Sequence, residues 1–318
     1  MKKRTTLALL LAVSVLIFDS RTAVESAREA LCLCGRVLIP SLFPLLVLSQ
    51  MLVPGLAGMT IPGLNRLLGF PEGFFLLGSL GGYPLGAACI AHSAGRGELS
   101  REDAARMMGL CSLCGPGFLF GIVGGLLSLR DAALIFGIQL EAALFIATFW
   151  PGIQKGSCQP SLDPPSISDA VNRAVNTVLT VSGWVILAAV AAGFLRRWLF
   201  PLLPDGAAVV LTGLLELTNG IYALQSVNRE AQLVLCALFV SFGGISVLLQ
   251  IAGLSEGIGM GQCIAQKTVH GLLAMALAFL CLRLGNIALF LIPVLLFAKI
   301  AVEIPLHMVY NVCRKEGI

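Results

Sequence analysis

Long apolar stretches separated by short polar ones run along nearly the whole chain. At roughly twenty residues per membrane-spanning helix, this pattern predicts an all-α polytopic membrane protein with about 8–10 membrane segments. The expected segments cover residues 7–18, 37–53, 73–94, 104–129 and 132–150 in the first half, and 176–195, 207–224, 231–254, 268–283 and 287–302 in the second.

The composition supports this class of protein. Hydrophobic residues make up 57% of the chain and charged residues 12%, whereas soluble domains carry roughly 25% charged residues. The formal net charge is only +4, so no nucleic-acid partner is expected, and the basic residues are interpreted as signals of membrane orientation. The ten cysteines are scattered through apolar segments and are expected to pack as small hydrophobic residues, Cys111 and Cys114 included.

Charge and proline content divide the chain into five parts. An N-terminal membrane anchor and interfacial helix (1–26), a first membrane repeat (27–150), a polar Pro/Ser linker (151–170), a second membrane repeat (171–255) and C-terminal membrane helices with a short polar tail (256–318) are expected. We expect the anchor to be retained, with its amino end in the cytoplasm. In the first repeat, Ser100 is expected to cap a helix, with Asp103 three residues later.

Glycine and proline interrupt four of the apolar segments. Residues 78–86 read Gly-Ser-Leu-Gly-Gly-Tyr-Pro-Leu-Gly, and residues 114–117 read Cys-Gly-Pro-Gly. The second half repeats this order at 213–220 and 242–246. Such residues break helices, and broken helices at membrane depth, in corresponding places of two halves, point to the binding site of a transporter. The pattern predicts two related repeats with broken or re-entrant helices, and leaves open whether the repeats are parallel or inverted.

Five motifs together resemble the YlbJ/SpoVV family of sporulation integral membrane proteins. They lie at 39–44 (Ile-Pro-Ser-Leu-Phe-Pro), 81–87 (Gly-Gly-Tyr-Pro-Leu-Gly-Ala), 115–118 (Gly-Pro-Gly-Phe), 216–220 (Glu-Leu-Thr-Asn-Gly) and 241–250 (Ser-Phe-Gly-Gly-Ile-Ser-Val-Leu-Leu-Gln). The resemblance implies a nucleoside-recognition Gate-type domain, distantly similar to concentrative nucleoside transporters, and an activity that moves dipicolinic acid across the outer forespore membrane. This chain has Gly81 and Ala88 where the family pattern has serine and lysine, so a basic residue is missing from a position suited to an anion.

The strongest single candidate for the site is Glu216, because an ionisable side chain near the middle of a span is costly and is a functional hypothesis by default. Thr218 and Asn219 follow it, and unwinding at Gly220 is expected to free carbonyls. Together these residues are suited to a coupling H⁺ or Na⁺ or to a polar substrate. The alternative is a buried glutamate that hydrogen-bonds to asparagine or threonine across a helix interface.

The other candidates lie at the remaining breaks. Gly82, Tyr83 and Pro84 are expected to provide an aromatic wall and free N–H groups for a carboxylate, or simply a kink that allows close packing. The residues expected to line the cavity or contact the solute at the other two breaks are Gly115, Pro116, Gly243, Gly244, Ser246 and Gln250. A role in the substrate pathway and a structural hydrogen bond remain equally open for Gln139 and Glu141. His92, His270 and His307 have no metal-ligand spacing.

These observations predict a transporter that moves a small polar or anionic solute by alternating access. No enzyme is expected, because no nucleophile–base or metal constellation is found, and no cofactor beyond a coupling ion is implied. The alternatives are a permease for a nucleoside-like solute and a non-transporting membrane morphogenesis or scaffold protein. The expected location is the cell membrane, with the lipid bilayer as a partner and a homo-oligomer left open; the family resemblance implies the outer forespore membrane.

Overall fold

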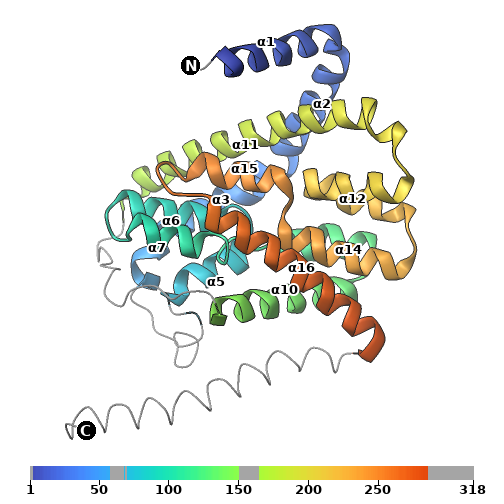
Figure 1. Ribbon diagram of the computed structural model, residues 1–318. Helices are drawn as coiled ribbons and strands as arrows, with labels where there is room; N and C mark the ends of the chain where they lie inside the picture. The colour runs from blue at the N-terminus through green and yellow to red at the C-terminus, as the bar shows by residue number, and fades with distance from the viewer. Residues whose placement is uncertain (1–2, 58–67, 69, 150–164, 286–318) are drawn as a thin grey trace, which may run out of the picture.

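The computed structural model describes residues 3–57, 68, 70–149 and 165–285, and within these residues the chain forms helices and no strand (Figure 1). The α-helices of the first half are α1 (Lys3–Phe18), α2 (Ser20–Leu33), α3 (Ile39–Ala57), α5 (Glu72–Gly81), α6 (Leu85–Gly95), α7 (Arg101–Met108), α8 (Pro116–Phe118), α9 (Gly124–Leu126) and α10 (Leu129–Phe149). Those of the second half are α11 (Ile167–Trp198), α12 (Asp205–Leu215), α13 (Leu217–Ala223), α14 (Arg229–Phe242), α15 (Gly244–Leu254) and α16 (Gly261–Leu284). The expected last span (287–302) and His307 lie outside the described residues, as does most of the 151–170 linker.

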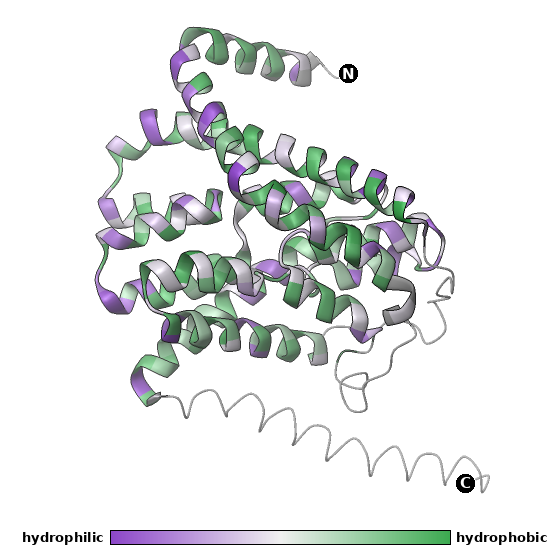
Figure 2. Cartoon of the chain, turned by 180° about the vertical axis from the view of Figure 1, so that it is seen from behind, coloured by the Kyte–Doolittle hydropathy of each residue, from purple (hydrophilic) through white to green (hydrophobic). Residues whose placement is uncertain are grey.

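Among the described residues, four stretches are long and apolar enough to cross a membrane, namely Leu129–Phe149, Ile167–Leu202, Arg229–Leu254 and Gly261–Leu284. Figure 2 shows hydrophobic residues along most of the length of these helices. Many large apolar side chains face outward, and such a surface is stable only against lipid or another protein. The chain is therefore a multi-pass membrane protein in contact with the bilayer, and the expected all-α fold is confirmed. Further apolar helices, such as α6 and α12, are shorter than a span, so the total of 8–10 segments stays a prediction.

The order of intact and interrupted helices is the same in the two halves. In the first half, α3 is followed by the α5–α6 pair, then by the interrupted run from α7 to α9, then by the intact helix α10. In the second half, α11 is followed by the α12–α13 pair, then by the α14–α15 pair, then by the intact helix α16. The intact helices contact one another across the halves, α3 against α11 and α10 against α16.

The α14–α15 pair is the most enclosed of the four long stretches, because 67% of its apolar 18-residue segment is buried inside the protein. It contacts α16 through α14 and α11 through α15. At the amino end, α2 also packs along α11, where Ser26 fits against Gly193. Helix α1 projects away from the other helices (Figure 1).

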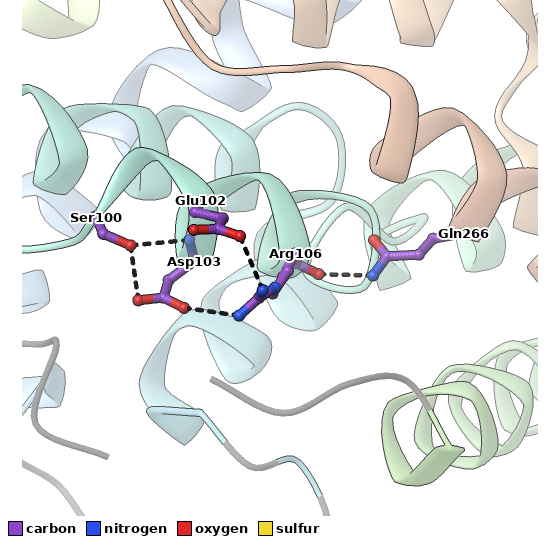
Figure 3. Close-up of polar contacts among 5 residues, drawn as sticks. All are labelled: Ser100, Glu102, Asp103, Arg106 and Gln266. Atoms are coloured by element: carbon purple, nitrogen blue, oxygen red, sulfur yellow. Dashed lines mark hydrogen bonds and ion pairs between the residues drawn. The ribbon is translucent and has the colours of Figure 1, made fainter. Parts of the chain in front are cut away.

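The expected helix start at Ser100 is confirmed, and a hydrogen bond near the other end of the same helix joins α7 to α16. The Ser100 hydroxyl accepts from the backbone N of Asp103 at 3.0 Å, which satisfies an otherwise unpaired N–H group of the first turn. Near the other end of α7, Gln266 donates from Nε2 to the backbone oxygen of Arg106 at 2.6 Å (Figure 3). Helix α16 is thereby fixed beside the second interruption of the first half.

Candidate functional site

Four helix breaks lie inside the bundle, and we number them in chain order. The first break (residues 82–84) separates α5 from α6, and the second (109–115) separates α7 from α8. The third (residue 216) separates α12 from α13, and the fourth (residue 243) separates α14 from α15. The first, third and fourth breaks fall inside the predicted stretches 78–86, 213–220 and 242–246. The second ends inside the predicted stretch 114–117 but begins earlier, at residue 109, because α7 already ends at Met108.

The four breaks pack against one another through glycine. Gly82 has a φ of 79°, and a Cβ atom there would lie 2.8 Å from the backbone N of Gly115, so the first break touches the second. A Cβ at Gly243 would lie 3.3 Å from Cζ of Tyr83, which joins the first break to the fourth. The helix start at Gly244 packs in the same way on the backbone on either side of the third break. These contacts bring together segments that are far apart in the sequence.

Lys267 of α16 reaches this cluster from the side, and sequence reasoning missed it. Its side chain is fully buried, and Nζ donates to the backbone oxygen of Ser112 in the second break at 2.8 Å. Nζ also lies 4.9 Å from the centroid of the Tyr83 ring and 3.5 Å from the Tyr83 hydroxyl. That hydroxyl donates to the backbone oxygen of Val240, just before the fourth break. Among the described residues, no carboxylate forms an ion pair with Lys267.

A pattern in α16 could have identified this lysine. The buried residues of α16 recur every three or four positions and include Cys263, Lys267, His270 and Ala274, so Lys267 lies on the inward face. The expected span began only at residue 268, whereas the helix begins at Gly261 and carries Lys267 well inside it. The predicted start was too late because Gln262, Gln266 and Lys267 make the amino end of the helix less apolar than the rest.

Gln139 and His270 hold the second break in place. The Gln139 carboxamide donates to the Cys114 carbonyl at 2.7 Å and accepts from the Cys114 N–H at 3.1 Å, which satisfies the backbone where the helix is interrupted. His270 Nε2 lies 2.8 Å from the backbone oxygen of Gln139. These contacts favour the structural role of Gln139 over a role in the substrate pathway. For Glu141, whose Oε2 is buried without a partner in the described part of the chain, both readings remain open.

Two neighbouring cavities adjoin the breaks. The larger, of about 420 Å³, is lined by Gly82, Tyr83, Gly115 and Thr218, together with apolar residues that include four leucines from the α2–α3 region. The smaller, of about 190 Å³, is lined by Glu216, Thr218 and Asn219, and across from them by Arg196 and residues of α2. Thr218 lines both cavities, so predicted residues at the first, second and third breaks lie around two adjacent cavities.

At the third break the position of Glu216 is as expected, whereas the expected unwinding at Gly220 is wrong. Glu216 lies in the interruption itself, half-buried, and caps α13 by accepting from the backbone N of Thr218 at 3.0 Å and of Asn219 at 2.7 Å. Gly220 does not unwind the helix, because α13 continues through it to Ala223. A Cβ at Gly220 would lie 2.2 Å from Cα of Gly213, so this glycine allows α13 to pack closely against α12.

The other predicted residues have more local positions. Pro84 directly precedes α6 and Pro116 is the first residue of α8, where the missing N–H of proline is tolerated. Ser246 and Gln250 are buried on α15, and neither they nor Gly243 and Gly244 are among the described residues that line the two cavities.

Within the described part of the chain, no group of three or more histidine, cysteine, aspartate or glutamate side chains is placed to hold a metal ion. The Ser241 hydroxyl, one residue after Val240, is buried without a hydrogen-bond partner among the described residues.

Comparison with known proteins gives one distant relative. The sporulation integral membrane protein YlbJ of Bacillus subtilis (strain 168) is 24% identical over 298 residues, in an alignment that covers 76% of this chain and 72% of the relative. The chain is thus a distant homologue of that protein. No family model and no solved structure matches the chain.

Proposed function

We propose that this distant homologue of a sporulation integral membrane protein is a transporter that carries a small anionic solute by alternating access during sporulation. The observation that carries the proposal is Lys267, a fully buried cation without a carboxylate partner among the described residues, placed where broken helices meet. Dipicolinic acid is the solute implied by the family resemblance.

A buried lysine is expensive in a membrane protein. A lysine at the centre of a membrane helix costs about 2.5–3.5 kcal/mol on insertion scales, and such residues usually mark solute or ion pathways. The hydrogen bond to the Ser112 carbonyl and the contact with the Tyr83 ring offset part of this cost. A solute carboxylate would supply the missing negative charge. Lys267 would in turn supply the positive charge that the family pattern places at position 88.

The larger cavity suits a solute of this size. Its volume of about 420 Å³ falls within the range of roughly 300–1,000 Å³ that is typical of small-molecule sites. Tyr83 lines this cavity and also holds Lys267 Nζ over its ring, so it stands between the two. We infer that the Tyr83 side chain turns aside when a carboxylate reaches Nζ. The unpartnered Ser241 hydroxyl, beside the carbonyl that anchors Tyr83, is then available to the solute.

The repeated order of helices supports a transporter built from two related repeats. Each half has an intact helix, two interrupted segments and a second intact helix, and the corresponding intact helices contact one another. Transporters with such repeats place the solute between them and move one repeat against the other. Glu216, which lines the adjoining cavity, is the candidate for binding a coupling H⁺ or Na⁺.

The test is the thermal stability of the purified protein in detergent, titrated with dipicolinate and with a panel of nucleosides and other dicarboxylates. A ligand that binds only the folded state stabilises it by about 2.7 kcal/mol at one hundred times its Kd. We expect a saturable shift with dipicolinate that is lost in Lys267→Met and largely kept in Lys267→Arg, which retains the charge. Arg130→Gln on the exposed start of α10 is the matched control for removal of one positive charge.

Each outcome of this titration bears on a different part of the proposal. A shift with another dicarboxylate but not with dipicolinate would keep the anion transporter and change its solute. A shift with nucleosides that persists in Lys267→Met would replace the anion by a nucleoside-like solute. Without a shift from any compound, the scaffold alternative would be favoured.

A further inference from the structure

A third cavity, of about 830 Å³, is lined by the end of α6, the start of α11 and the α15–α16 loop. Figure 1 shows these three segments at the same end of the bundle. Its wall contains Arg96 and Arg101, which lie at the two ends of the α6–α7 turn, and Arg173 of α11. His92 and Glu256 also line it. None of the candidate residues of the central site is among the described residues that line this cavity.

The cavity wall carries an excess of positive charge. Three guanidinium groups and the carboxylate of Glu256 line the cavity, and Glu98 neutralises Arg96, which leaves one positive charge when His92 is neutral. His92 is neutral in this arrangement because its Nε2 contacts the Arg173 guanidinium, which can only donate hydrogen bonds. Arg96 pairs with Glu98 at 2.8 Å. In the described part of the chain, neither Arg101 nor Arg173 forms an ion pair.

A buried polar side chain completes the wall. Gln50 of α3 is only 4% exposed, and its Oε1 has no hydrogen-bond partner in the described residues. The same carboxamide carries an NH₂ group, and this is the kind of donor from which an oxyanion accepts a hydrogen bond. The cavity therefore combines uncompensated arginines with a polar group in need of a partner.

We propose that this cavity binds a small oxyanion, either a carboxylate or a phosphate. Arginine binds both groups with two parallel N–H donors, and the charge of such a ligand neutralises the wall. The shared chemistry has two sources, a free solute and the phosphate headgroup of an anionic lipid. Helix α6 connects this cavity, at its carboxyl end, with the first break at its amino end. Use of the cavity as an entrance to the central site rests on the proposed function, whereas the binding itself does not.

The experiment measures equilibrium binding by titration calorimetry in a Lys267→Met background, so that the central cation does not contribute. Dipicolinate and inorganic phosphate are the soluble ligands, tested in detergent. Nanodiscs of phosphatidylglycerol and of phosphatidylcholine test the lipid source. The variant is Arg101→Gln with Arg173→Gln. The matched control is Arg130→Gln with Arg283→Gln, which removes the same charge from exposed side chains that are not among the described residues lining the cavity.

We expect the cavity variant to weaken binding of a soluble oxyanion by about tenfold or more, because each charged hydrogen bond contributes roughly that factor. The control should bind as the parent does. Arg101→Lys with Arg173→Lys, which keeps the charge, should retain most of the binding even if the packing of Arg101 on Gly257 is disturbed. Glu256→Gln removes the opposing carboxylate and should strengthen binding by about two- to fivefold.

Loss of dipicolinate or phosphate binding in the cavity variant would support a free solute. Competition by phosphatidylglycerol but not phosphatidylcholine, abolished in the same variant, would support a lipid headgroup. Equal binding of all three anions by the cavity variant and the control would overturn the proposal. Because the background already lacks Lys267, this outcome is separate from failure of the proposed central site.

Discussion

The contact between Gly213 and Gly220 is the sharpest test of how the third break is built. In the Gly220→Ala variant, the new Cβ would lie 2.2 Å from Cα of Gly213 and 3.0 Å from its backbone N. Carbon atoms in contact are normally about 3.5–4.0 Å apart, so α12 and α13 must separate by more than about 1 Å. The atoms in the way are backbone and cannot rotate aside.

The expected loss of stability follows from two opposing effects. Overpacking costs typically 1–3 kcal/mol, and a clash with backbone belongs at the upper end. Replacing glycine by alanine inside a helix returns about 1 kcal/mol. We therefore expect Gly220→Ala to lower the free energy of unfolding by about 2 kcal/mol and the Tm by about 5 °C.

The assay is thermal unfolding in detergent, with Gly137→Ala as the matched control. Gly137 lies inside α10, and no atom lies within 4 Å of the Cβ it would carry, so the same substitution should be neutral or stabilising by up to about 1 kcal/mol. Equal Tm values for the two variants would refute close packing of α13 on α12. They would also restore the expectation that Gly220 is a point of unwinding.

Two further predictions concern the other breaks. Gln139→Leu leaves both the N–H and the carbonyl of Cys114 without their partner and should destabilise the protein by about 2–4 kcal/mol, measured by thermal unfolding; a neutral effect would show that the second break does not need this contact. Glu216→Gln keeps an acceptor for the start of α13 but removes the charge, so it should cost only about 0.3–1 kcal/mol while slowing solute transport. A folded Glu216→Gln variant that transports at the normal rate would remove Glu216 from the mechanism.

Much of the fold follows from local features of the sequence. Glycine and proline at 78–86, 114–117 and 242–246 cannot continue a helix in lipid without help. The first and fourth breaks occur within those stretches, and the second ends within 114–117 but begins earlier, at residue 109. The cap at Ser100 was predictable for the same reason, since it depends only on the three residues that follow. The order of intact and interrupted segments required no more than the spacing of these signals.

The features that were missed depend on contacts between distant segments. The role of Gly220 is set by Gly213 on the preceding helix, and nothing in the local sequence distinguishes a glycine that packs from a glycine that unwinds. The proposed role of Lys267 depends on its contacts with Ser112 and Tyr83, which lie more than 150 residues away in the sequence. The basic cavity brings together Arg96 and Arg101, at the α6–α7 turn, with the distant Arg173 of α11 in the same way.

The most direct test of the central claim is uptake of dipicolinate into proteoliposomes that contain the purified protein, measured with imposed H⁺ and Na⁺ gradients. The parent protein is expected to show saturable uptake, Lys267→Arg to retain part of it, and Lys267→Met to lose it by about tenfold or more, since one charged contact with the solute is removed. The Arg130→Gln control should transport as the parent does. Uptake by Lys267→Met at the parent rate, or no uptake by the parent under either gradient, would contradict transport of this anion through a site built around Lys267.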